Sequence, residues 1–173
     1  MSQEDPTLVV RPVDSKRFIG GAGIVAAHAS GLSGKSALLS VVGADAEADF
    51  ARNSLEHCKV RTKLFEDATR PTTLKTRYRC QGKTLLRVSR LNQMATVPEI
   101  SEQILNAVQD QKSKVDLVIF SDFNYGVLSQ EVFEELFGIL KSTNATMCAD
   151  SQSSSQFGDV ARFKGMDLLT PTE

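Results

Sequence analysis

The chain has 173 residues, with 20 basic and 21 acidic side chains. This length suits one α/β domain with a substantial core. The balanced charge excludes a bulk electrostatic grip on nucleic acid or anionic lipid, so neither a nucleic acid nor a membrane is expected as a partner. No apolar run reaches the roughly 20 residues that span a bilayer, and the first residues lack the basic and apolar regions of a signal peptide. A cytoplasmic protein is therefore expected.

The cysteines and histidines show no metal-site pattern. Cys58, Cys80 and Cys148 are widely separated and form no Cys-x-x-Cys pair, and the two histidines, His28 and His57, do not complete a zinc-ligand spacing with them. Reduced thiols are predicted, and no metal ligands are assigned.

The first part of the chain predicts alternating strands and helices. Valines bracketed by prolines predict a short strand at 8–13. Small residues at 24–29 predict a tightly packed helix that ends at the following glycines. The continuous apolar run at 36–42 is typical of a strand buried on both faces of a parallel sheet. Asp45 is expected to cap a helix that runs to about residue 57.

The next segments predict a strand and a hairpin. A strand is expected at 60–65, followed by alternating segments at 72–79 and 84–88 that a Gln81-Gly82 turn would join. Leu74, Thr76 and Tyr78 would share one face of the hairpin, and Lys75, Arg77 and Arg79 the other. Together with 8–13, these strands predict a small antiparallel sheet set apart from the main layer.

The second half predicts regular strand–helix alternation. Helices are expected from Pro98 to about 108 and from Ser129 to 141, and strands at 115–120, 145–149 and 167–169. This order predicts a parallel, doubly wound sheet with right-handed crossovers. Ligands bind beyond the carboxyl ends of such strands, which marks the loops that begin at 121, 150 and 170.

Six segments carry a family resemblance. They read Gly-Gly-Ala-Gly-Ile-Val-Ala at 20–26, Val-Val-Gly-Ala-Asp at 41–45, Thr-Arg-Pro-Thr-Thr-Leu-Lys-Thr-Arg-Tyr at 69–78, Leu-Leu-Arg-Val at 85–88, Phe-Ser-Asp-Phe-Asn-Tyr-Gly-Val-Leu at 120–128 and Leu-Leu-Thr-Pro-Thr-Glu at 168–173. In this order and spacing they resemble the PfkB, or ribokinase-like, carbohydrate kinases. The segments at 69–78 and 85–88 resemble the lid of the heptose-7-phosphate kinase branch, the kinase half of ADP-heptose synthases.

The resemblance implies an incomplete ribokinase-like domain over 1–173, in which a doubly wound parallel sheet carries an antiparallel β lid with strands at about 7–19 and 60–90. It implies ATP-dependent phosphorylation of a sugar or sugar phosphate. ATP and Mg²⁺ would serve the complete enzyme, with neither tightly bound to this chain. The family's first strand and its ATP-binding half are expected outside the chain, with the catalytic Asp beyond Glu173. The chain alone is therefore expected to be inactive, and a homodimer through the lid strands is expected.

The resemblance also assigns site residues. The substrate would be bound by Gly20, Gly21, Ile24, Lys75, Arg77, Arg87, Asp122, Asn124 and Tyr125, and the nucleotide by Asp150, Gln152 and Thr172. Physical reasons accompany part of this set: a di-glycine lets backbone pass close to a sugar, and two cations on one strand face can meet a phosphate. Ordinary turns, a solvated strand face and an Asx-type turn at each Asp are the structural alternatives.

Four positions depart from the kinase pattern. Ile24 stands where the family usually has Asn, Tyr125 replaces Lys, Ser151-Gln152 replaces Pro-Lys, and Thr172 replaces Asn. Each change removes a polar or cationic contact. They favour a second hypothesis, a non-catalytic pseudo-kinase that binds sugar or nucleotide. A third is a generic doubly wound nucleotide-binding domain, although no Gly-x-Gly-x-x-Gly follows a strand as its Rossmann form requires.

Overall fold

The computed structural model describes residues 9–151 and 160–170. The elements are α1 (Gly21–Ser33), β1 (Ala37–Val42), α2 (Ala46–His57), β2 (Arg61–Glu66), β3 (Leu74–Cys80), β4 (Lys83–Arg90), α3 (Pro98–Gln109), the 3₁₀ turn η1 (Lys112–Lys114), β5 (Leu117–Asp122), α4 (Gln130–Lys141), β6 (Thr146–Ser151), η2 (Val160–Arg162) and β7 (Leu168–Leu169). Within these ranges, no helix is both long enough and apolar enough to cross a membrane.

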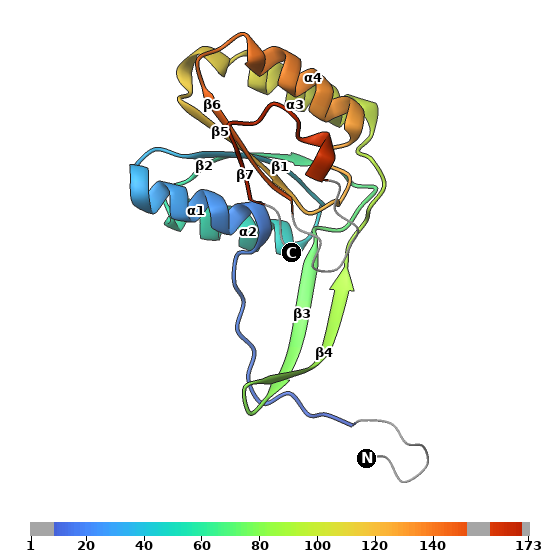
Figure 1. Cartoon of the computed structure of the whole chain (residues 1–173). Coiled ribbons are helices and arrows are strands. Elements are labelled where there is room, and N and C mark those ends of the chain that lie inside the picture. Colours follow the sequence, from blue (N-terminus) through green and yellow to red (C-terminus); the bar gives the residue numbers. More distant parts are fainter. Residues whose placement is uncertain (1–8, 152–159, 171–173) are drawn as a thin grey trace.

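Two parallel sheets lie between two layers of helices (Figure 1). One sheet pairs β1 with β2, and the other has the strand order β5-β6-β7. Helices α3 and α4 lie on one side of the sheets, and α1 and α2 lie on the other. The predicted α/β class, with parallel strands and a separate antiparallel lid, is confirmed.

The helix ends follow local sequence chemistry. Asp45 caps α2 by accepting a hydrogen bond from the Ala48 N–H at 3.0 Å, as the sequence predicted. Ser129 caps α4 in the same way through the Val132 N–H. Gly34, in the left-handed region at φ 78°, ends α1.

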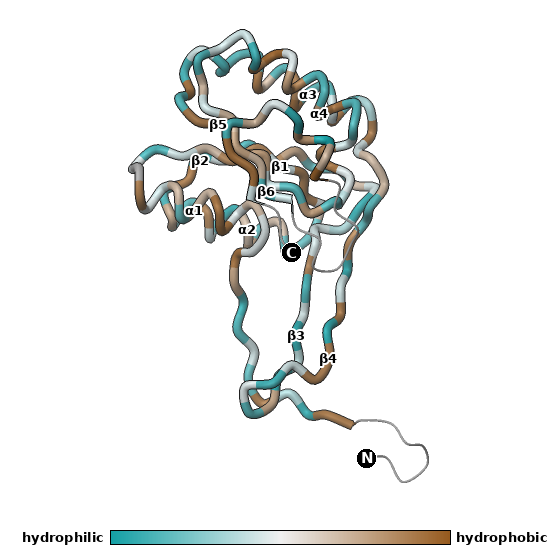
Figure 2. The backbone as a smooth tube through the Cα atoms, viewed as in Figure 1, coloured by the Kyte–Doolittle hydropathy of each residue, from teal (hydrophilic) through white to brown (hydrophobic). Residues whose placement is uncertain are grey.

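Four phenylalanines lie in the larger core, between the sheets and helices α3 and α4. Phe163 has no exposed surface. Its ring meets that of Phe133 edge-on, with the centroids 4.8 Å apart, and Phe133 meets Phe120 in the same way at 5.2 Å. A smaller core of Ala26, Leu55 and Val60 joins α1 and α2 to the first sheet. Figure 2 shows strongly hydrophobic stretches along β5 and β6, between the helix layers.

The two parallel sheets are not continuous with each other in the described part of the chain. β1 hydrogen-bonds only to β2, and β5 only to β6, so each has an edge without a strand partner. The sequence predicted that β1 would be buried on both faces, but its first residue is exposed and the next four are half-buried. The reason is that β1 and β5 form opposite walls of a large cavity.

The lid is smaller than expected and consists of the β3–β4 hairpin, which projects from the body (Figure 1). Its turn has Gln81 at φ 48° and Gly82 at φ 80°, the left-handed pair that tight hairpins require. The segment at 60–65, predicted as part of the lid sheet, instead forms β2 and pairs in parallel with β1. Burial of Phe65 in the main core explains this position, since an antiparallel lid strand would leave that ring in solvent.

The strand predicted at 8–13 is also wrong within its described part. Residues 9–13 form no strand, and their valines are exposed. The prolines and the lack of a neighbouring strand in the described structure explain this, because Pro12 cannot donate to a ladder. Leu8 lies outside the described residues.

Candidate functional site

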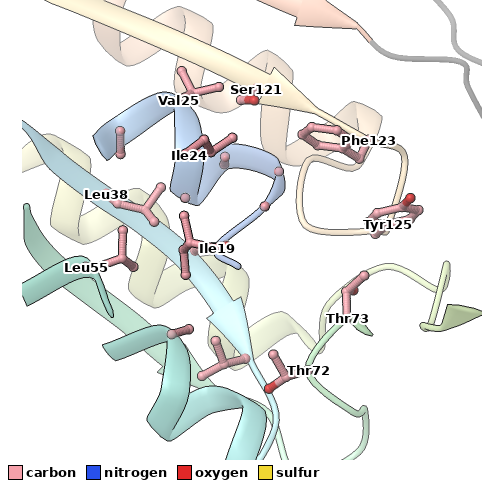
Figure 3. Close-up of a pocket in the computed structure, with 18 of the residues that line it drawn as sticks. Ile19, Ile24, Val25, Leu38, Leu55, Thr72, Thr73, Ser121, Phe123 and Tyr125 are labelled. Atoms are coloured by element: carbon pink, nitrogen blue, oxygen red, sulfur yellow. The ribbon is translucent and has the colours of Figure 1, made fainter. Parts of the chain in front are cut away.

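A cavity of about 1850 Å³ lies between the β1 and β5 edges and reaches the loops at their carboxyl ends. Apolar side chains from α1 and β1 form much of its wall, among them Ile24, Val25 and Leu38 (Figure 3). Phe123 and Tyr125 lie on the loop after β5, and Tyr125 lies nearer to Thr73 at the lid entry. Their rings stack with centroids 6.0 Å apart. The cavity therefore has an apolar body and a more polar rim.

Most of the predicted substrate residues meet at this cavity. Its lining includes Gly20, Gly21, Ile24, Lys75, Arg77, Asp122 and Tyr125. Arg87 and Asn124 are exposed and lie outside the lining, as does the half-buried Asp150 at the end of β6. Gln152 and Thr172 lie outside the described residues.

The di-glycine begins α1. Gly20 is the N-cap in an extended conformation, and Gly21 has φ 53°. A Cβ at Gly21 would lie 3.5 Å from the Phe123 ring, which is an ordinary contact, so the backbone angle rather than space favours glycine there. The positive φ lets α1 begin directly beside the loop after β5.

The basic face of the lid hairpin consists of Lys75, Arg77 and Arg87. Arg77 stands directly opposite Arg87 in the antiparallel register, so both side chains lie on one face. In the described structure neither forms an ion pair. Like charges placed opposite each other are destabilising, and a bound anion would relieve their repulsion.

Lys75 connects this basic face to the loop after β5. Its Nζ lies 5.1 Å from the centroid of the Tyr125 ring, in cation–π geometry. Arg79, predicted on the same face, lines the cavity together with Lys75 and Arg77, and the register shifts between Tyr78 and Arg79. Its guanidinium also donates to the Gly82 carbonyl at 2.8 Å, within the hairpin turn.

Asp122 forms contacts that the sequence did not predict. Its Oδ2 lies 2.9 Å from Nη2 of Arg162, with the two side chains 6% and 11% exposed, and its Oδ1 accepts the Asn124 N–H at 2.9 Å. The Arg162 contact is electrostatic, because neither Nε nor Nη2 has a well-aligned acceptor among the described residues. Phe163, in the main core, holds the η2 turn that carries Arg162. The carboxylate therefore has partners within the fold in addition to its place in the cavity lining.

Other site residues were missed by sequence reasoning. Ser121 lies at the cavity end of β5, and its Oγ is buried without a hydrogen-bond partner in the described structure (Figure 3). Its position at a strand end beside Asp122 was an available signal. Arg70 and Arg162 gave no such signal, because their importance lies in contacts with segments distant in the sequence.

Two carboxyl groups near the base of the lid have lowered pKa values. Hydrogen bonds from Thr69, reinforced by Arg70, hold the pKa of Asp67 below its usual 3.8 despite burial. For Asp45, burial acts to raise the pKa, but hydrogen bonds from Thr72 and Ala48 and the charge of Arg90 together lower it. Both groups are therefore ionised at neutral pH and act as acceptors.

Residues 2–173 match the family model described as pfkB family carbohydrate kinase. The chain belongs to this family. It is 30% identical over 174 residues to the bifunctional protein HldE of Desulfatibacillum aliphaticivorans, covering 100% of this chain and 35% of the relative. The HldE protein of Helicobacter pylori strain Shi470 is 28% identical over 172 residues, covering 99% of this chain and 36% of the relative. The pfkB chain thus spans about a third of the length of these relatives.

Solved structures of other kinases share the fold. The tetrameric inhibited form of phosphofructokinase-2 from Escherichia coli matches with a TM-score of 0.60 and 16% identity, over 83% of this chain and 49% of that chain. Ribokinase from Giardia lamblia matches with a TM-score of 0.55 and 14% identity, over 79% of this chain and 41% of that chain. These matches confirm the predicted ribokinase-like fold.

Proposed function

We propose that this pfkB chain forms the substrate-binding and lid part of an ATP-dependent kinase for a sugar phosphate of the heptose-7-phosphate type. Carbohydrate-kinase membership is established by the family match, and the HldE relatives motivate the narrower substrate class. The observation that carries the proposal is the basic face of the lid hairpin, from which Lys75 and Arg77 line the cavity.

Each part of the site has a distinct role in this proposal. The substrate phosphate would accept hydrogen bonds from Arg77 and Arg87, whose planar guanidinium groups suit bidentate contact with phosphate oxygens. The negative charge of the phosphate would also offset the repulsion between the two arginines, which stand opposite each other in the hairpin. The backbone at Gly20 and Gly21 and the apolar wall would contact the sugar ring.

ATP is the proposed phosphoryl donor, with Asp150, Gln152 and Thr172 as nucleotide-binding positions. Mg²⁺ bound with the nucleotide would supply electrostatic stabilisation for phosphoryl transfer. Residues 9–151 and 160–170 contain no cluster of three or more His, Cys, Asp or Glu side chains suited to a metal. Mg²⁺ would arrive with the nucleotide, because this ion is usually held by substrate phosphates together with one or two carboxylates.

A coupled ADP-release assay on the full-length protein tests the proposal. The acceptors are heptose 7-phosphate, other sugar phosphates and the matching unphosphorylated sugars, each with ATP and Mg²⁺. Turnover of a phosphorylated acceptor is expected above the ATP hydrolysis rate measured without acceptor. Turnover of unphosphorylated sugars alone would still show a carbohydrate kinase, but it would contradict the proposal that the acceptor is a sugar phosphate.

A non-catalytic pseudo-kinase is the second candidate, and two observations favour it. Ile24 lines the cavity with an apolar side chain, 38% exposed, where the family usually has a sugar-binding Asn. Asp122, a predicted sugar ligand, is engaged by Arg162. Calorimetric binding of sugar or nucleotide by the full-length protein, without turnover of any acceptor, would establish this alternative.

We also propose a homodimer formed through the lid strands. Leu86 and Val88 share a face of the hairpin with Tyr78 and Thr76, and are 50% and 48% exposed. Figure 2 shows hydrophobic stretches along β4 in this projecting hairpin. The Escherichia coli phosphofructokinase-2 structure is described as tetrameric, which shows that a protein of this fold assembles. In sedimentation velocity, Leu86→Lys should dissociate the dimer, whereas Thr84→Lys should not; a wild-type monomer would contradict the assignment.

A further inference from the structure

Arg70 joins three separate segments at the base of the lid hairpin. Its side chain is only 6% exposed, and its Nε donates to Asp67 Oδ2 at 2.9 Å. Nη1 donates to the Tyr125 carbonyl at 3.2 Å. Nη2 donates to the carbonyls of Met94 at 3.0 Å and Ala95 at 2.9 Å. One buried guanidinium therefore has one carboxylate and three backbone carbonyls as acceptors.

These acceptors belong to three different parts of the fold. Asp67 follows β2 in the first parallel sheet, and Tyr125 follows β5 in the second. Met94 and Ala95 follow β4, where the chain returns from the lid. Since the two sheets share no strand pairing in the described structure, Arg70 is a direct polar link between them and the lid exit.

The lid entry is fixed beside the same group. The Thr72 N–H donates to Asp45 Oδ2 at 2.9 Å, and the Gly43 N–H donates to Thr72 Oγ1 at 2.8 Å. A Cβ at Gly43 would lie 2.5 Å from the Arg70 carbonyl oxygen, so these backbones are closely packed. The hairpin entry at Thr72 therefore follows Arg70 closely in the sequence, and the hairpin exit at Met94 and Ala95 is hydrogen-bonded to its side chain.

We propose that Arg70 is a positioning residue that sets the lid against the loop after β5 and so places Lys75 beside Tyr125. Lys75 lies on β3, shortly after the fixed lid entry, and Tyr125 supplies its own carbonyl to Arg70. Arginine suits this role because its fork presents five N–H donors in one plane, whereas lysine presents a compact charge. Only the consequence for substrate binding rests on the proposed function.

Native cysteines allow a direct test of lid position. Cys58, at the end of α2, and Cys80, at the end of β3, are both exposed thiols. Spin labels on these two positions, with every other cysteine of the full-length protein replaced, report the distance between body and lid by pulsed electron paramagnetic resonance. Arg70→Lys retains the charge but loses the fork, and should broaden or shift the distance distribution. Arg61→Lys, at the exposed first residue of β2, is the matched control and should leave the distribution unchanged.

A second, less disruptive variant keeps the proposal testable if Arg70→Lys fails to fold. The Thr69 hydroxyl donates to Asp67 Oδ1 at 2.6 Å, and Thr69 is exposed, so Thr69→Val removes an orienting bond without emptying the core. It should broaden the distribution less than Arg70→Lys. A distribution identical to wild type in folded samples of both variants would overturn the proposal, even if their melting temperatures fall, because a purely structural role predicts that result.

Substrate affinity provides the functional readout. Arg70→Lys should raise KM for the phosphorylated acceptor about tenfold, since displacement of a binding group by an ångström is costly. In a Lys75→Ala background the same replacement should add little, because the group that Arg70 positions is already absent. Full additivity would contradict action through Lys75. If no acceptor is turned over, the spin-label result still decides the role of Arg70 while the proposed function fails separately.

Discussion

Removal of the Asp67 carboxylate charge should destabilise the fold strongly. Asp67→Asn leaves the buried Arg70 cation with carbonyl acceptors but no counter-charge, and the two side chains are only 1% and 6% exposed. Loss of one partner of a buried ion pair costs about 3–5 kcal/mol, a large share of the roughly 5–15 kcal/mol by which single domains are stable. For a domain of this size the melting temperature should fall by about 10 °C.

The effect should depend on pH with a defined sign. The pKa of Asp67 in the folded protein lies below its usual 3.8, chiefly because of the hydrogen bond from the Thr69 hydroxyl. As the pH falls, the unfolded chain therefore binds the proton first. The stabilisation is fully present above about pH 5 and decreases as the pH falls through 3.8 towards the folded pKa. The difference between wild type and Asp67→Asn should thus be largest near neutrality.

Urea unfolding monitored by circular dichroism between about pH 7 and pH 3 measures this difference. Asp116→Asn is the matched control, because Asp116 is exposed and its side chain forms no ion pair in the described structure. Equal unfolding free energies for wild type and Asp67→Asn at neutral pH would refute the reasoning. A difference in unfolding free energy that stays constant as the pH is lowered towards about 3 would also refute it.

Two further substitutions test close packing and buried charge. Gly126→Ala should destabilise by well over the roughly 1 kcal/mol expected for a positive φ alone, because a Cβ there would meet the Met94 carbonyl oxygen at 1.8 Å. Gly82→Ala is the control with the same φ of 80° and no atom within 4 Å, so equal losses in thermal melts would contradict the packing argument. Arg162→Met should cost about 3–5 kcal/mol by leaving Asp122 buried without its cation, and adding Asp122→Asn should recover part of the loss. Denaturant titrations of both variants check this, and no recovery would show that Arg162 stabilises by packing alone.

Local sequence chemistry predicted most of the helices and strands. The caps at Asp45 and Ser129 were predicted because a short polar side chain preceded a helical pattern. The hairpin turn at Gln81-Gly82 was predicted because few residue pairs adopt two successive left-handed conformations. These features depend on neighbours within a few residues, which one sequence displays directly.

Strand partnership was predicted less well because it is non-local. The segment that forms β2 precedes the hairpin and was grouped with it, yet its partner is β1 on the other side of α2. Period-two alternation does not distinguish an edge strand of a lid from the edge of a parallel sheet. The burial of Phe65 decided the outcome.

In the candidate site, too, individual residues were predicted from the sequence, but contacts between distant segments were not. Lys75 and Tyr125 were each singled out by resemblance, and the structure brings them within cation–π range. The contacts of Asp122 with Arg162, and of Arg70 with Tyr125, join segments far apart in the sequence. No spacing rule indicates such pairs, because their geometry is set by how the helices and sheets pack.

In the proposed function, the basic face of the lid hairpin binds the phosphate of the acceptor. The most direct test of this proposal is KM for the phosphorylated and unphosphorylated forms of one sugar, measured with the wild-type full-length protein and with Arg77→Ala. Wild type should favour the phosphorylated form, and Arg77→Ala should raise KM for that form about tenfold or more, with little change in KM for the unphosphorylated sugar. An equal change for both acceptors, or no change for either, would contradict it.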